Sequence, residues 1–282
     1  MESTPNITEQ NGRILFDFSG VTFKENKTVY QIDDILTERK NSDGCWIVDN
    51  ENFLSYSFSK SLDIVLVLDV SSSLGQNIST IKDNAVDMIT NILTNNPEAK
   101  IAVLKFSRGS VNTNFSSSIS MLTQFILQDA IFNSPDIGNY VLEGRNETGL
   151  YEAINSAIQL IDASSARGKG ILTFTDGVSN FSFDPQFSTP DNVISSLTNS
   201  DISSYTIGYE GNQNSVEQSI LEQIAVNGDF SFPRNLNDLD QVFQVFSNSV
   251  AAVYDLTYDT NNAKFDGEIE YRFLFNTTKI SD

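Results

Sequence analysis

Oxygen-bearing side chains follow a short hydrophobic segment in residues 62–73, LDIVLVLDVSSS. The segment is rich in Val, Leu and Ile and lacks polar alternation, which is typical of a parallel strand buried on both faces. Asp69 ends it, and Ser71 and Ser73 follow at alternate positions. One carboxylate and two hydroxyls are ligands that suit a hard cation such as Mg²⁺. Chance supplies Asp-x-Ser-x-Ser in roughly one of three chains this rich in Asp and Ser, so the pattern needs support from elsewhere.

Two further positions could supply oxygens to the same site. Asp176 and Gly177 directly follow an apolar segment at 170–175, so they place another carboxylate at a strand end. Thr148 lies in GRNETGLYEAI, just before a helical periodicity that begins near Leu150. Each has a structural alternative, since Ser, Thr and Asp are also common helix caps and turn residues. If both elements flank the first strand, their loops converge on one edge of the sheet.

The elements that would position these side chains alternate between strand and helix. Strand-like segments occur at 62–68, 100–106, 170–175, 204–209 and 230–232. Between and after them run apolar stripes at helical spacing, which begin at Ile81, Leu150, Val193, Val216 and Leu239. This order predicts an α/β fold with a doubly wound, mostly parallel sheet flanked by helices, whose ligands bind at the carboxyl ends of the strands.

The two ends of the chain, residues 1–61 and 254–282, show a different pattern. Apolar side chains alternate with other residues at Ile14, Phe16, Phe18, Tyr271, Phe273 and Phe275. Period-two alternation predicts antiparallel strands with one solvated face. Because neither flank is long enough for a comfortable core, we expect both to form one small β-sandwich, with the α/β domain of residues 62–253 inserted between them. Separate docking of each flank is the alternative.

Composition restricts the possible functions. The chain has 37 acidic and 17 basic residues, a net charge of −20, which argues against nucleic acid or anionic membrane as a partner. It contains no His, which removes the commonest general base and rules out Ser-His-Asp catalysis. The single cysteine, Cys45, can form neither an intramolecular disulfide nor a thiolate zinc site, and we expect it to be a small buried residue.

Targeting signals are not evident in the sequence. No run of 18 apolar residues is present, so we expect no direct membrane insertion. Residues 1–11 are too polar for a secretory signal peptide. These observations leave either a cytosolic protein or one whose targeting segment has been removed.

Taken together, residues 62–253 resemble a von Willebrand factor A (vWA) domain of bacterial type. The resemblance covers about two thirds of the chain and includes the order of DIVLVLDVSSS, KIAVLKFS, NETGLYEAI, ILTFTDG and SYTIGY. The set Asp69, Ser71, Ser73, Thr148 and Asp176 matches the metal-ion-dependent adhesion site of that family. The resemblance implies that the three hydroxyls contact the ion and that the two aspartates act through hydrogen bonds or bridging waters. It also implies a coordination position for a carboxylate of a partner protein.

The resemblance leads to an expected function. We expect a non-enzymatic adhesion or protein-binding module that holds Mg²⁺, with Mn²⁺ or Ca²⁺ as alternatives, and that binds a protein ligand offering a carboxylate. An extracellular or cell-surface location fits this function better than a cytoplasmic one. The alternative is a vWA scaffold or assembly subunit for an ATPase or another enzyme complex. A metal-dependent hydrolase is a third possibility, which the lack of His and of a free general base opposes.

Overall fold

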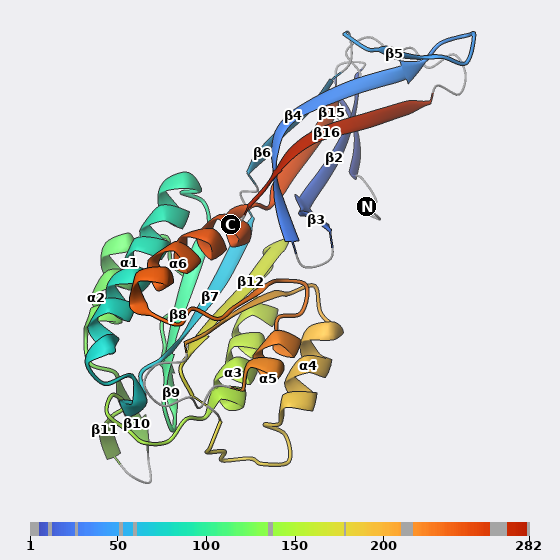
Figure 1. Ribbon diagram of the computed structural model, residues 1–282. Coiled ribbons are helices and arrows are strands. Elements are labelled where there is room, and N and C mark those ends of the chain that lie inside the picture. Colours follow the sequence, from blue (N-terminus) through green and yellow to red (C-terminus); the bar gives the residue numbers. More distant parts are fainter. Residues whose placement is uncertain are drawn as a thin grey trace. The chain divides into compact units, whose positions relative to one another are not determined.

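The computed structural model describes residues 6–10, 13–25, 28–50, 53–58, 61–134, 138–177, 179–209, 217–259 and 270–280 (Figure 1). The chain divides into two compact units. One consists of Met1–Lys60 with Ala252–Asp282, and the other of Ser61–Ala251.

A six-stranded sheet forms the centre of Ser61–Ala251, with the strand order β14-β13-β12-β7-β8-β9. All neighbouring strands are parallel except the edge strand β9, which is antiparallel to β8. The strands are β7 (Leu62–Asp69), β8 (Lys100–Phe106), β9 (Ser110–Asn112), β12 (Gly168–Thr175), β13 (Ser203–Gly208) and β14 (Phe230–Ser231). The chain leaves β7 for β8 on one side and returns to β12 on the other, so the sheet has its topological switch point between β7 and β12.

Helices cover both faces of this sheet (Figure 1). Helices α3, α4 and α5 pack on one face, and α1 and α6 pack together on the other, with α2 against α1. The helices are α1 (Ile78–Asn95), α2 (Ile119–Leu127), α3 (Leu150–Asp162), α4 (Pro190–Thr198), α5 (Gln218–Ile224) and α6 (Leu236–Ala251). The predicted doubly wound α/β fold is therefore confirmed.

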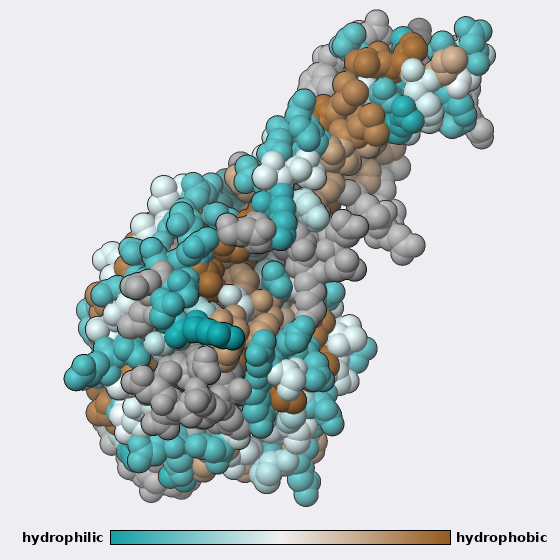
Figure 2. Space-filling model, viewed as in Figure 1, coloured by the Kyte–Doolittle hydropathy of each residue, from teal (hydrophilic) through white to brown (hydrophobic). Residues whose placement is uncertain are grey.

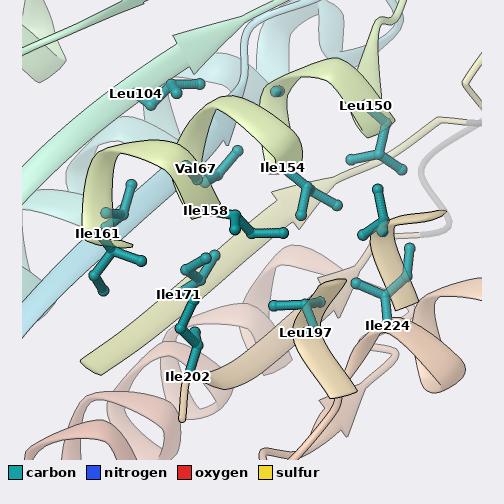
Figure 3. Close-up of a cluster of buried hydrophobic side chains, with 14 of the residues drawn as sticks. Val67, Leu104, Leu150, Ile154, Ile158, Ile161, Ile171, Leu197, Ile202 and Ile224 are labelled. Atoms are coloured by element: carbon teal, nitrogen blue, oxygen red, sulfur yellow. The ribbon is translucent and has the colours of Figure 1, made fainter. Parts of the chain in front are cut away.

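Figure 3 shows the apolar core that fixes the strand ends on the α3 side of the sheet. The sheet contributes Val67, Leu104 and Ile171, and α3 contributes an apolar stripe that includes Ile154 and Ile158. Burial of each such side chain contributes about 1.5–3 kcal/mol relative to exposure. On the opposite face aromatic pairs hold α6, with ring centroids 5.8 Å apart in the pairs Phe174–Phe243 and Tyr205–Phe246.

The flanking unit consists of two antiparallel sheets. The first has the order β1-β2-β15-β6 and the second β16-β4-β3, with β5 also paired to β4. Strands β15 and β16 come from the C-terminal flank and pair with N-terminal strands. The bounds are β1 (Asn6–Gln10), β2 (Arg13–Val21), β3 (Phe23–Glu25), β4 (Thr28–Lys40), β5 (Trp46–Val48), β6 (Phe53–Phe58), β15 (Tyr254–Asp259) and β16 (Tyr271–Lys279).

Tyrosines of β15 join the two sheets of the flanking unit. The ring of Tyr258 lies 5.1 Å from that of Phe273, and the Tyr254 hydroxyl accepts a hydrogen bond from the backbone N–H of Ile32. On the outer face of the second sheet the paired side chains of Leu36 and Leu274 are exposed. Figure 2 shows hydrophobic surface, coloured brown, over this sheet.

Several local features differ from the sequence-based expectations. Helix α2 and the hairpin of β10 (Ile131–Ser134) and β11 (Gly138–Val141) were not predicted. Helix α2 spans only nine residues, fewer than the window over which helical periodicity is read. The expectation that Cys45 is buried is wrong: it is exposed, in the turn between β4 and β5, where its N–H donates to Asn41 Oδ1. In the part of the chain that the structure describes, no helix is long and apolar enough to cross a membrane.

Candidate metal-ion site

Asp69 is a fully buried carboxylate at the carboxyl end of the central strand β7. Its Oδ1 accepts a hydrogen bond of 2.9 Å from the backbone N–H of Ser71. Its Oδ2 accepts one of 2.6 Å from Thr175 Oγ1, on the neighbouring strand β12. These bonds fix the orientation of the carboxylate and connect the two strands that border the switch point.

The two predicted serines extend this network into the next loop. The chain turns after β7 into a short 3-10 segment, Ser72–Asn77, in which Gly75 has a positive φ of 52°. Ser71 Oγ and Ser73 Oγ lie 2.9 Å apart, and Ser73 Oγ donates to Asp176 Oδ1 at 2.7 Å. Four of the five predicted residues are therefore joined by contacts of hydrogen-bond length.

Thr148 approaches the same cluster from the loop before α3. Its N–H donates to Asn180 Oδ1 at 2.7 Å, and its carbonyl accepts from the N–H of Asn180 at 3.0 Å. The side chain is buried, and a Cβ added to Gly177 would lie 3.5 Å from Thr148 Oγ1. The Thr148 hydroxyl thus faces the turn that follows Asp176, so the structure brings all five predicted residues to one edge of the sheet.

The electrostatics of the cluster favour a positive charge. Burial raises the pKa of Asp69 above its usual value, although hydrogen bonds from Ser71 and Thr175 partly oppose the shift. Burial, together with the nearby charge of Asp69, raises the pKa of Asp176 to about 7, against the lowering effect of its hydrogen bond with Ser73. A carboxylate whose ionisation is disfavoured by burial and by a neighbouring carboxylate is stabilised by a proton or by a bound cation.

The donor set fits a hard divalent cation. Two carboxylates and three hydroxyls offer only oxygen, which Mg²⁺, Mn²⁺ and Ca²⁺ prefer over nitrogen or sulfur. In the described ranges no group of three or more His, Cys, Asp and Glu could hold a metal ion. An ion at this site would therefore depend on the hydroxyls of Ser71, Ser73 and Thr148 as much as on the aspartates.

Two supporting residues were not identified from the sequence. Thr175, the last residue of β12, orients Asp69, and this role depends on the register in which β12 pairs with β7. Asn180 bonds the backbone of Thr148 on both sides. No sequence pattern reveals this role, since it depends on how the loop after β12 folds back.

The fold is that of a doubly wound α/β domain, with a cluster of oxygen-bearing side chains at its switch point. The chain belongs to the von Willebrand factor type A domain family, whose family model matches residues 63–263. Members of this family serve in adhesion and protein interaction and often bind a divalent metal ion. A comparison with curated proteins finds no match.

Solved structures show the same fold at low sequence identity. A von Willebrand factor type A protein from Catenulispora acidiphila is 11% identical, with a TM-score of 0.54 over 93% of this chain and 74% of that one. The vWF domain of the type V pili tip protein Mfa5 from Porphyromonas gingivalis is 12% identical, with a TM-score of 0.51 over 67% and 94%. Proximal thread matrix protein 1 from the mussel byssus, with a zinc-occupied MIDAS motif, is 17% identical, with a TM-score of 0.53 over 70% and 50%, so this chain spans about half its length.

Proposed function

We propose that the protein is an adhesion or protein-binding module that holds Mg²⁺ at its oxygen cluster and binds a carboxylate of a partner protein through that ion. The residues that would hold the ion are Asp69, Ser71, Ser73, Thr148 and Asp176. The observation that carries the proposal is the continuous run of contacts from Thr175 through Asp69, Ser71 and Ser73 to Asp176, all between 2.6 and 2.9 Å.

The chemistry of the ligands supports a role in recognition. Neutral hydroxyl ligands neutralise little of the charge of a bound cation. An Asp or Glu of the partner would therefore interact with the cation more strongly here than at a site saturated with carboxylates. The ion supplies a Lewis-acidic position for that carboxylate. The residues of this chain hold the hydroxyls in place: Thr175 fixes Asp69, and Asn180 fixes the backbone of Thr148.

Binding rather than catalysis is favoured by the residues that surround the site. The chain contains no His, and both site carboxylates are held by hydrogen bonds within the cluster, Asp69 from Thr175 and Asp176 from Ser73. The similar structures include a pilus tip protein and a byssus matrix protein with a zinc-occupied site, which supports an extracellular or cell-surface role and binding of a divalent ion. Mn²⁺ or Ca²⁺ could replace Mg²⁺ on the same ligands.

Isothermal titration of the full chain with Mg²⁺ tests the metal site. We expect one site per chain in the wild type and no measurable binding by Ser73→Ala or Asp69→Asn. Asp162 is an exposed acidic residue at the end of α3, so Asp162→Asn is the matched control, and we expect it to keep the wild-type affinity for Mg²⁺.

The affinity for Mg²⁺ should also depend on pH. Because the ion competes with a proton at Asp176, whose pKa is about 7, we expect the affinity for Mg²⁺ to rise about tenfold from pH 6 to pH 8. Equal heats for the wild type and both site variants would refute the proposal.

A further inference from the structure

Arg108 lies in the turn between β8 and β9, next to the loop that contains Thr148. The carbonyl of Ser107 accepts a 2.7 Å hydrogen bond from the N–H of Gly149, the residue after Thr148. A Cβ added to Gly149 would lie 3.1 Å from the carbonyl oxygen of Arg108. The turn that carries Arg108 is therefore in direct contact with the loops of the proposed metal site.

Aromatic rings hold the Arg108 guanidinium in place. Its Cζ lies 4.6 Å from the ring centroid of Phe181 and 5.7 Å from that of Phe183, and these two rings pack edge to face with centroids 4.7 Å apart. Both rings belong to the loop that follows Asp176. Stacking of a guanidinium on aromatic faces fixes its plane and leaves its edge free to donate.

The hydrogen-bonding capacity of this guanidinium is largely unused. Among the described residues no hydrogen bond reaches it, and its buried Nε has no hydrogen-bond partner. Its ion pair with Glu147 has an Nε–O distance of 3.5 Å, and both side chains are about two-fifths exposed, at 40% and 43%. Exposed pairs of this kind contribute little to stability, so a ligand can replace Glu147 at small cost.

Arg145 adds a second positive charge on the neighbouring loop. Its guanidinium Cζ lies 4.7 Å from the Tyr140 ring centroid, and its carbonyl accepts a 2.8 Å hydrogen bond from the N–H of Ser72, inside the proposed metal site. Nearby lysines are engaged within the fold: Lys82 pairs with Glu143 at 2.6 Å, and buried Lys105 donates to backbone carbonyls at the end of α2. In a chain of net charge −20, the two arginines bring positive charge to this edge of the sheet, beside the acidic side chains of Glu143 and Glu147.

We propose that Arg108 binds a second carboxylate of the partner, so that the ligand is a segment with two acidic side chains. One would reach the metal ion, and the other would form a bidentate pair with Arg108, while Arg145 attracts both. This inference rests on the proposed function and specifies the partner's chemistry. Charge complementarity supports it, because a guanidinium with free donors beside a cation site matches a diacidic segment and repels a basic one.

A peptide library displayed on phage can test the inference with the full chain. Selection in Mg²⁺ with elution by EDTA recovers only metal-dependent binders. We expect the peptides selected by the wild type to share one invariant acidic residue and a second acidic residue at a fixed spacing from it. We expect the peptides selected by Arg108→Gln to share only the first. Equal enrichment of the second acid by both proteins would overturn the inference while the proposed function stands. Recovery of no EDTA-sensitive peptide would overturn both.

Affinities of one selected peptide at saturating Mg²⁺ provide the second measurement. We expect the peptide to bind about tenfold more weakly when its second acidic residue is replaced by the corresponding amide, and equally so when the protein carries Arg108→Gln. The two changes together should weaken binding no further, because both remove the same bond. Arg108→Lys should restore binding only in part, because an ammonium lacks the bidentate fork. Glu147→Gln should tighten binding up to about fivefold by removing the competing carboxylate.

Arg167 is an exposed arginine between α3 and β12, so Arg167→Gln is the matched control for the loss of one positive charge. Equal losses from Arg108→Gln and Arg167→Gln would show a general field effect and refute the specific pair.

Discussion

Thr175→Val exchanges one buried hydroxyl for a methyl group of nearly the same size at the end of β12. In the wild type, Thr175 Oγ1 donates to Asp69 Oδ2 at 2.6 Å and accepts from the N–H of Gly177 at 3.1 Å. The variant keeps the volume of the side chain and removes both bonds. Any effect therefore measures the hydrogen bonds that orient Asp69 rather than packing.

The expected cost follows from the nature of the two bonds. A hydrogen bond to a charged group contributes about 1.5–3 kcal/mol net, and a neutral one about 1 kcal/mol. We therefore expect Thr175→Val to lower the free energy of unfolding by about 2–4 kcal/mol. The bond also lowers the pKa of Asp69 against the effect of burial, so its removal raises that pKa further and weakens Mg²⁺ binding at neutral pH.

Thr173→Val is a closely matched control on the same strand. Thr173 points to the same face two residues earlier and is equally buried, but its Oγ1 has no hydrogen-bond partner in the described part of the chain. Its replacement removes an unsatisfied buried hydroxyl, so stability should be unchanged or slightly higher. Urea unfolding followed by circular dichroism reports on this unit, because all six described helices lie in Ser61–Ala251. Equal costs for the two variants, or a Thr175→Val variant with wild-type Mg²⁺ affinity, would refute the reasoning.

Two further predictions concern stability. In Gly228→Ala the new Cβ would lie 2.0 Å from the backbone oxygen of Ser204, so we expect a loss of about 2 kcal/mol or more in urea unfolding. Gly144→Ala, where the Cβ meets nothing within 4 Å, should cost only the strain of its φ of +82°, about 1–2 kcal/mol, and a larger effect there would contradict the steric argument. Burial lowers the pKa of Lys105 to about 8, so the unfolded chain binds this proton more tightly and the free energy of unfolding rises as the pH increases from about 8 to 10.5. Lys105→Met should remove that part of the pH dependence in unfolding curves, and an unchanged pH profile would contradict it.

The sequence contains the information that locates the strand ends. Apolar runs without alternation predicted β7 and β12, and parallel strands carry their carboxyl ends to one edge of the sheet. Asp69 and Asp176, which directly follow these runs, could therefore be expected to meet, and the structure joins them through Ser71 and Ser73. The proximity of these residues could be predicted because it depends only on where the segments end and on the strand order.

The supporting contacts depend on details that a single sequence does not reveal. Thr175 faces Asp69 because β7 and β12 pair in one particular register, and a shift by one residue would turn its hydroxyl to the other face. Phe181 lies against Arg108 because two loops 73 positions apart fold onto each other. Such contacts arise from loop conformation, for which no periodic pattern exists.

The charges around the site indicate separate roles for its acidic and basic groups. Burial raises the pKa values of both Asp69 and Asp176, and the charge of Asp69 adds to the shift of Asp176. Neither Arg108 nor Arg145 is among the groups that shift these two pKa values. The arginines therefore do not neutralise the site carboxylates, although they lie on adjoining loops. Both guanidinium groups instead act on Tyr140, where they oppose the rise in its pKa. The two aspartates are therefore stabilised by a proton or by a bound cation, and the charge of the arginines is left for an acidic partner of the kind proposed above.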